Sequence, residues 1–401
     1  MTWTFKLSDL YQVKKETLSV TLFHLGLLIA FLGSMSPWFM WAVGSLYPVP
    51  AAMLIVASLL VSRTMEEPVF TRSDYLLPLL AFVIYSVYEC LASERNINAY
   101  LLIAFKAVIV FSLLQLNGER LFHLTTFIAK VMGVLLAASL AGHFLYLLGF
   151  PLPGRPAQLG EFYSFTNHYL FLLDDRNLFT IVPRFNSYFP EPGHVGSAAA
   201  FLLFAQRGHW RKWYNMVLLA TIFFSFSLAS YIYLTAIVFL NLWIEKKNMF
   251  RKLAITVGFF LAAITLAFTY NGGDNLVHDL ILLRLEVDDD SLAGDNRVTG
   301  NFEKDYDNYL GSSDMIFGRT YDSSLEFGNA GFKVFFFDYG LVGILLVFLF
   351  YFLAMRNAPN KRAALSACII LSLYFIVSAY MFLEKILLPM YAAAYRDDVK
   401  T

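Results

Sequence analysis

The sequence predicts an all-α, polytopic integral membrane protein: a single transmembrane domain over residues 1–401 with two long extracytoplasmic loops. Hydrophobic residues make up 58% of the 401 positions, phenylalanine alone contributes 40, and only 15% of residues are charged. The mean hydropathy is +0.59. A water-soluble domain could not bury that much apolar surface. A membrane is therefore the expected solvent for most of the chain.

The apolar segments predict about eleven spans of roughly 20 residues each, or twelve if residues 384–395 re-enter the membrane. Several segments are shorter than that, which indicates tilted or re-entrant helices. The N-terminus lacks the cleavage pattern of a signal peptide, so we expect it to be retained. The predicted spans are 18–35, 40–62, 75–92, 98–114, 121–149, 194–206, 213–227, 230–244, 253–270, 331–355 and 363–383.

Basic residues set the predicted orientation, because short cytoplasmic loops carry an excess of Lys and Arg. We place the basic clusters in the cytoplasm and the long polar loops 150–193 and 271–330 outside. The stretch 213–244 must then cross twice, which predicts a tight hairpin turning near residues 227–230. The clusters are Lys6, Lys14 and Lys15; Arg207, Arg211 and Lys212; Lys246, Lys247, Arg251 and Lys252; and Arg356, Lys361 and Arg362.

Composition also narrows the function. The zero net charge argues against nucleic acid as a partner. The two cysteines, Cys90 and Cys368, both lie in apolar spans, so neither a disulfide framework nor a zinc site is indicated. The sequence has no Gly-rich phosphate loop and no internal repeat. Any enzyme or transporter on this chain would therefore draw its energy from an activated substrate or an ion gradient.

The end of the first long loop is the most informative segment. Residues 181–196 read Ile-Val-Pro-Arg-Phe-Asn-Ser-Tyr-Phe-Pro-Glu-Pro-Gly-His-Val-Gly, just before an apolar span. Arg184 and Glu191 lie among aromatic residues, and the prolines beside Glu191 stiffen the backbone. Such a loop is suited to hold a charged headgroup and a sugar. Tyr188 offers a flat ring face to the sugar, or packs in the core.

The second long loop is acidic but carries two arginines in glycine-containing contexts, Arg297 and Arg319. A guanidinium group matches phosphate oxygens bidentately, so these residues and Arg184 could hold a lipid diphosphate. The alternative is that each pairs with a loop carboxylate. Three consecutive aspartates at 288–290 could hold a divalent cation. They lack calcium-loop spacing, so a solvated surface is favoured and no metal site is predicted.

The arrangement resembles the O-antigen polymerase and O-antigen ligase superfamily of bacterial inner-membrane glycosyltransferases. The likeness rests on the Arg-Phe-x-x-x-Phe-x-Glu-Pro-Gly-x-x-Gly block at 184–196, the Ser-rich hairpin at 224–231, and the Asp-Tyr-Gly-Leu-Val-Gly span entry within 318–343. Topology extends it over the whole chain. The ligase branch carries a histidine before an asparagine near the last span entry. Here Asn329 remains without that histidine, which favours the polymerase branch.

The resemblance implies a reaction at the periplasmic face of the inner membrane. Repeat units linked to undecaprenyl diphosphate would be joined into O-antigen, capsular or exopolysaccharide, with no nucleotide sugar, metal or other cofactor. A chain-length regulator protein is a candidate partner. Two alternatives remain open. One is an O-antigen ligase that transfers glycan to a lipid core. The other is a flippase or transporter for lipid-linked oligosaccharide, which would be expected to show internal symmetry and broken helices.

Roles for individual residues follow from the chemistry. Glu191 is a candidate general base for the acceptor hydroxyl, or the ion-pair partner of Arg184. His194 is a second candidate base, or a hydrogen-bonding group at a helix start. Lys106 and Lys130 lie within spans, where they contact phosphate, pair or snorkel. The predicted substrate-binding residues are Arg184, Tyr188, Arg297, Arg319, Tyr321 and Asn329.

The predicted topology can be tested with single cysteines and a membrane-impermeant thiol reagent. We expect labelling from outside at positions 175 and 300 and none at 210, 248 and 360. Labelling at 210 or 248 from outside would contradict the topology, because the 184–196 block and the second long loop would then lie on different sides.

Overall fold

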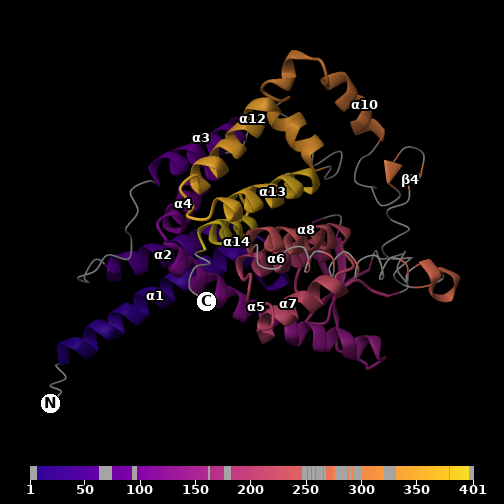
Figure 1. Ribbon diagram of the computed structural model, residues 1–401, viewed down its shortest axis with the longest axis horizontal. Helices are drawn as coiled ribbons and strands as arrows, with labels where there is room; N and C mark the ends of the chain where they lie inside the picture. Colours follow the sequence, from indigo (N-terminus) through magenta and orange to yellow (C-terminus); the bar gives the residue numbers. More distant parts are fainter. Residues whose placement is uncertain are drawn as a thin grey trace.

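The computed structural model describes residues 7–62, 75–92, 97–160, 163–175, 182–245, 300–319, 331–378 and 380–396, with isolated residues between 251 and 292 (Figure 1). Within these residues, six helices are long and apolar enough to cross a membrane. They are α1 (Leu7–Gly33, apolar from Glu16), the segment Gly44–Ser62 that ends in α2 (Pro48–Ser62), α4 (Ile97–Leu114), α5 (Gly118–Leu147), α8 (Leu228–Glu245) and α12 (Phe332–Met355). The chain is thus compatible with a multi-pass membrane protein.

Shorter helices complete the bundle. They are α3 (Leu76–Ala92), α6 (Pro192–Ala205), α7 (Trp213–Phe224), α13 (Lys361–Val377) and α14 (Glu384–Tyr395). Most predicted spans coincide with a helix to within a few residues; residues 40–46 instead form the 3-10 turns η1 (Trp38–Met40) and η2 (Gly44–Leu46). The stretch 213–244 divides into two helices as predicted, but the turn lies slightly before residues 227–230, because α7 ends at Phe224 and α8 begins at Leu228. The predicted span 253–270 falls almost entirely outside the described residues.

The first long loop contains β-structure, which the all-α prediction did not include. It contains an antiparallel sheet of β1 (Arg155–Leu159), β2 (Tyr163–Asn167) and β3 (Leu172–Asp174), in the order β1-β2-β3. Phe165 lies opposite Ala157 on one side and Asp174 on the other. Alternation along β2 buries Phe165 and Asn167 while Ser164 faces out, as the two-residue period of a strand requires.

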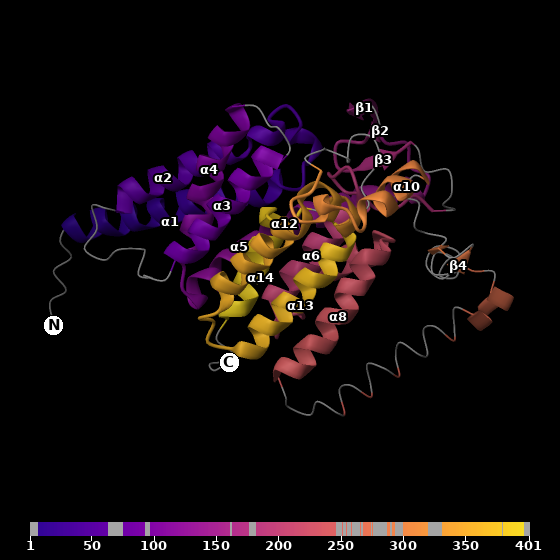
Figure 2. The same cartoon turned by 90° about the horizontal axis from the view of Figure 1, so that it is seen from above.

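Two ends of the bundle can be distinguished in Figure 2. The end that carries β1–β3 and α10 (Gly300–Tyr309) is called the outer end, and the end that carries the C-terminus is called the inner end. The sheet of the first long loop and α10 of the second therefore lie at the same end of the bundle. Residues 384–395, whose status the sequence left open, form α14, which runs from the outer to the inner end.

The helices α6 and α14 form the centre of the bundle. Every residue of α14 is buried, and α6 is buried from Val195 to Ala205. With 14 and 12 residues, they are about 21 and 18 Å long at 1.5 Å per residue. The hydrocarbon core of a bilayer is ~30 Å thick. Their ends therefore lie inside the protein, where other protein groups must satisfy them.

Two buried arginines satisfy the inner ends of these helices. Arg207 donates to the carbonyl oxygens of Ala393 (2.6 Å) and Arg396 (3.1 Å), and Arg396 donates to that of Ala205 (3.1 Å). These carbonyl groups lie at the C-terminal ends of α14 and α6, where backbone carbonyls have no partner within their own helix. The second guanidinium nitrogen of Arg396 donates to Nδ1 of His209 (2.9 Å). Burial and the Arg396 charge lower the pKa of His209, which keeps the imidazole a neutral acceptor.

At the outer end, α12 is broken within its helical span. Gly340 has φ 59° and ψ −165°, which interrupts the helix. The backbone of residues 316–319 fills the break: Ile316 accepts from the N–H of Val342 (3.0 Å), and Arg319 N–H donates to Phe337 (2.9 Å). The backbone groups released by the break are thus paired again, as burial demands.

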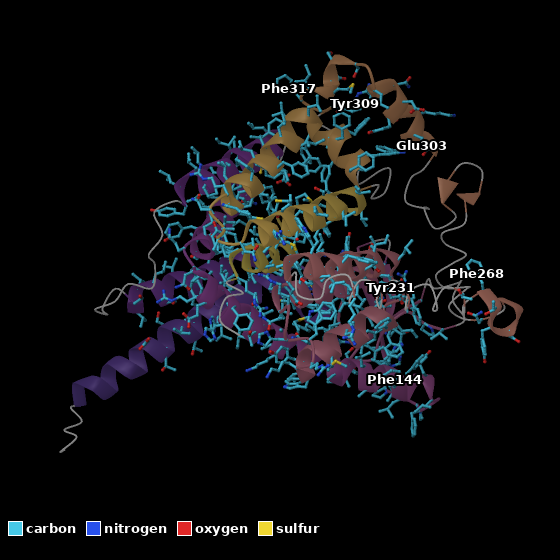
Figure 3. All side chains as sticks on the ribbon, in the orientation of Figure 1. Phe144, Tyr231, Phe268, Glu303, Tyr309 and Phe317 are labelled. Atoms are coloured by element: carbon cyan, nitrogen blue, oxygen red, sulfur yellow. The ribbon has the colours of Figure 1, made fainter. Side chains whose placement is uncertain are left out.

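A small cap covers this break. The helix α10 and the turn η6 (Ser313–Met315) pack on the start of α12 through a second hydrophobic cluster, formed by Phe302, Tyr306, Tyr309, Val334 and Phe337. Figure 3 shows Tyr309, Phe317 and Glu303 in this cap, above α12. Lys333 pairs with Glu303 (3.7 Å).

The close approach at the break predicts a sharp difference between two glycines. A Cβ on Gly318 (φ +82°) would lie 2.1 Å from the carbonyl oxygen of Asp338, whereas one on Gly311 (φ +88°) would meet no atom within 4 Å. We expect Gly311→Ala to cost about 1–2 kcal/mol through left-handed strain alone. Gly318→Ala should cost about 3 kcal/mol or more. Thermal unfolding in detergent measures both; equal losses would contradict the described packing.

Candidate active site at the outer end of α6 and α14

The segment before α6 is fixed by backbone hydrogen bonds from three sides. Phe185 N–H donates to the carbonyl of Phe224 (3.0 Å), Ser187 accepts from Leu172 (2.7 Å), and Tyr188 accepts from Trp38 (2.9 Å). The side chains of Phe185 and Phe189 are buried. The aromatic residues of the 184–196 block therefore serve as anchors that hold the polar residues of the block in place.

Tyr188 belongs to this anchoring set. Tyr188 is 7% exposed, and its ring lies in an edge-to-face arrangement with the ring of Phe39, with 6.0 Å between the ring centroids. Burial raises the pKa of Tyr188, so its hydroxyl stays protonated at neutral pH. Of the two roles considered from the sequence, packing describes the observed geometry, and little of the ring is accessible to a sugar.

Glu191 and His194 meet at the start of α6. Glu191 is the residue before Pro192, and its Oε2 lies 3.7 Å from Nε2 of His194. The hydroxyl of Tyr163 on β2 donates to Oε1 of Glu191. The side chains of Glu191 and His194 are 42% and 37% exposed. Both side chains are therefore part-exposed at this end of the bundle, while Nδ1 of His194 is buried.

Arg184 lies beside the turn between α7 and α8. Its Nε donates to the carbonyl oxygen of Ser225 (3.4 Å), and its charge acts on Tyr231 at the start of α8. The helix α8 can begin this close to α6 because Gly196 has no side chain. A Cβ there would lie 2.2 Å from Oγ of Ser230. The block 184–196 and the Ser-rich hairpin, far apart in sequence, are thus packed directly together.

Arg319 belongs to the cap on α12. It forms an ion pair with Asp314 (3.3 Å), and its guanidinium lies over the rings of Tyr309 and Phe337 at 5.7 and 5.4 Å. Pairing with a loop carboxylate was the structural alternative for this residue, and that pair is present. The remaining predicted substrate-binding residues, Arg297, Tyr321 and Asn329, lie outside the described residues.

The structure adds a lysine that the sequence reading did not select. Lys385, in the first turn of α14, is 1% exposed, and its charge interacts with Glu191 and His194. Its backbone N–H donates to Oγ of Ser34 (3.0 Å). The sequence did offer a signal for Lys385. Two consecutive charged residues, Glu384 and Lys385, begin the apolar stretch 384–395, and charged residues in a membrane are costly and mark functional candidates.

A second carboxylate lies next to Lys385 in the chain. Glu384 is 4% exposed and accepts a hydrogen bond from the hydroxyl of Tyr47 (2.7 Å) at the start of α2. Lys106 on α4 supplies its neighbouring positive charge. The three roles considered for Lys106, a contact with phosphate, pairing or snorkelling, stay predictions. Lys130, the other lysine within a span, is exposed on α5, as expected for a side chain that snorkels.

The outer end of α6 and α14 can therefore accept a proton and attract an anion. Glu191 and His194 are the proton acceptors. The N-terminal ends of both helices point outward and carry partial positive charge, and Lys385 lies in the first turn of α14. Among the described residues, no group of three or more His, Cys, Asp or Glu could hold a metal ion.

Comparison with known proteins returned no match among protein-family models, curated proteins or solved structures. The functional argument therefore rests on the residues and their geometry.

The contact between β2 and Glu191 predicts that Tyr163→Phe destabilises the outer end. Loss of a hydrogen bond to a charged group typically costs about 1.5–3 kcal/mol. Tyr169→Phe is the matched control, since Tyr169 lies in the same loop, is 46% exposed and meets Trp38 and Arg155 through its ring. Thermal unfolding and proteolysis of residues 150–190 measure the effect. Equal behaviour of the two variants would show that the Tyr163 hydroxyl does not hold the sheet.

Proposed function

We propose that the chain is a membrane glycosyltransferase that polymerises undecaprenyl-diphosphate-linked oligosaccharide repeat units at the periplasmic face of a bacterial inner membrane. One observation carries the proposal: the part-exposed Glu191 and His194 meet at the outer start of a buried helix. They do so within the block that resembles the polymerase and ligase superfamily. The partners expected are lipid-linked glycans, membrane lipid and a chain-length regulator.

In the proposed reaction, Glu191 accepts the proton of the acceptor sugar's hydroxyl group. The hydroxyl oxygen attacks the anomeric carbon of the donor glycan and forms the new glycosidic bond. The bond between that carbon and the diphosphate oxygen breaks, and undecaprenyl diphosphate leaves with the electron pair. Positioned proton transfer of this kind typically contributes about 10²–10⁴-fold to the rate.

The leaving diphosphate needs preorganised positive charge, because negative charge develops on its oxygen in the transition state. Arg184 and the N-terminal ends of α6 and α14 lie at the same end of the bundle as Glu191 and are assigned this role. Arg297 is proposed to contribute from the second long loop. Arg319, which already pairs with Asp314, would have to exchange that partner for phosphate.

The two alternatives keep specific support. A flippase is favoured by the break of α12 at Gly340 and by the buried charges of Glu384 and Lys385, because transporters use broken helices and intramembrane charges. A ligase would use the same block with a different acceptor. The partial exposure of Glu191 and His194 at the outer end favours chemistry there over transport through the bundle.

The general-base role of Glu191 predicts that Glu191→Gln abolishes long glycan chains. The measurement is the length of the glycan ladder in a strain that lacks the chain and carries the variant. The amide keeps the size of the side chain but cannot accept the proton, so we expect a loss of about 10²–10⁴-fold at normal protein level. Glu119→Gln is the matched control, because Glu119 also lies beside a histidine, His123 (3.9 Å), but is exposed on α5.

The outcomes separate the candidate functions. Near-normal ladders from Glu191→Gln would exclude the base role and transfer it to His194 or to no protein group. A strain without the chain that makes free polymer but attaches none to a lipid core would identify a ligase. Lipid-linked units that accumulate at the cytoplasmic face would identify a flippase.

A further inference from the structure

One face of the sheet β1–β3 lies against the end of the turn η1 at the outer end of the bundle (Figure 2). Phe165 on β2 meets Trp41, the residue after η1, with 5.9 Å between the ring centroids. Tyr163 lies two residues before Phe165, and Arg155 on β1 is opposite Asn167, two residues after it. All of these side chains therefore share one face of the sheet. The face carries a cation at one end and Tyr163 at the other.

The cation, Arg155, is held over two aromatic rings. Its Cζ lies 5.8 Å from the centroid of the Trp38 ring and 5.5 Å from that of the Tyr169 ring, within the range of cation–π attraction. The residue is exposed. The ion pairs found among the described residues do not include Arg155. Its guanidinium is thus oriented by the rings, while its charge is open to an anion from outside the chain.

Tyr169 is held beside this cation in an unusual backbone conformation. Its φ is 66°, in the left-handed region that residues other than glycine rarely adopt. Its N–H donates to Oδ1 of Asn167 (2.7 Å), and its carbonyl oxygen accepts from Nε1 of Trp38 (3.2 Å). Tyr169 nevertheless remains 46% exposed. The loop is therefore strained where an exposed ring lies beside the cation, and strain of this kind gathers at ligand sites.

This place is connected to the candidate active site along β2. Asn167 and Tyr163 are four residues apart, which corresponds to about 13 Å at 3.3 Å per residue. The rings of Phe165 and Tyr163 are stacked, with 6.0 Å between their centroids and 11° between their planes. The hydroxyl of Tyr163 donates to Glu191. The separation exceeds one sugar ring, so a ligand at Arg155 would be a unit of an oligosaccharide away from the reacting one.

We propose that Arg155 and Tyr169 form a binding subsite for an acidic sugar of the glycan, one that carries a carboxylate. The guanidinium binds the carboxylate through a bidentate pair of hydrogen bonds. The exposed ring of Tyr169 packs against the C–H groups on one face of the sugar. This inference rests on the proposed function, which supplies the glycan as the occupant. It predicts that the repeat unit contains an acidic sugar.

The binding test uses the purified full-length protein in nanodiscs of phosphatidylcholine. The probes are tetragalacturonic acid and its methyl ester, which lacks the negative charges, and isothermal titration calorimetry measures both affinities. We expect the wild type to prefer the acid by about 2–5-fold, the usual contribution of an ion pair open to water. Arg155→Gln should lose this preference. Arg155→Lys, which keeps the charge but not the fork, should retain part of it.

Two further variants separate the ring from the charge. Tyr169→Leu removes the flat ring, so it should weaken the binding of both probes and keep the preference for the acid. Lys304→Gln is the matched control for charge, because Lys304 is an exposed cation on α10 at the same end of the bundle. A wild type without preference for the acid, or an equal loss of preference in Lys304→Gln and Arg155→Gln, would overturn the proposal.

An anionic lipid is the competing occupant, because its phosphate carries the same sign of charge. The lipid lacks the flat apolar face that suits the ring of Tyr169. Nanodiscs that contain phosphatidylglycerol test this alternative. We expect the wild type to keep its advantage over Arg155→Gln for tetragalacturonic acid in these nanodiscs. Loss of that advantage would assign Arg155 to the lipid and overturn the proposal.

Glycan ladders separate the subsite from the proposed function. Arg155→Gln should shorten the ladder in a strain that lacks the chain and carries the variant, and sugar analysis of the ladder should find a carboxylate. A preference for the acid in a chain that polymerises no glycan supports the subsite and rejects the proposed function. Polymerisation of a repeat unit without an acidic sugar retains the proposed function and rejects the subsite.

Discussion

The structure depends on one constraint: α6 and α14 are buried helices too short to reach both surfaces of a bilayer, so their ends lie inside protein. The four first N–H groups and four last carbonyl groups of a helix lack internal partners. Away from water, protein groups must supply those partners. Two arginines do so at the inner end. At the outer end, Ser34 binds the first turn of α14, and the charges collect around Glu191 and Glu384.

Much of the fold was predictable because it follows from local pattern. Apolar runs locate the helices, and basic clusters indicate on which side of the membrane each helix ends. For this reason, the division of residues 213–244 into α7 and α8 was expected to within a few residues. The sheet β1–β3 was missed because its strands have five, five and three residues. Alternation over so few positions does not stand out in a loop. The break of α12 was missed because its cause is the distant segment 316–319.

In the candidate site too, some residues could be predicted from the sequence and others could not. Glu191 and His194 could be found together, because residues three apart share one face of a helical turn. Lys385 could not be assigned to the same end of the bundle from the sequence, since its place depends on how α14 packs beside α6. Arg319 was left with two alternatives, phosphate or a loop carboxylate, and the structure shows the second, an ion pair with Asp314 five residues earlier.

Polar side chains gather at the outer end, and their arrangement bears on the proposed chemistry. Glu384 accepts a hydrogen bond from Tyr47 at the start of α2, while Glu191 lies 3.7 Å from His194 at the start of α6. In the proposed transfer, Glu191 gains the acceptor's proton and loses its charge.

That step removes a negative charge from the outer start of α6 while negative charge develops on the leaving diphosphate. The site thus becomes more positive by one unit during the bond change, when such charge stabilises the transition state more than the ground state. A carboxylate in this place would therefore couple proton removal to leaving-group stabilisation. Water screens that effect less the more the bound substrate excludes it from the outer start of α6.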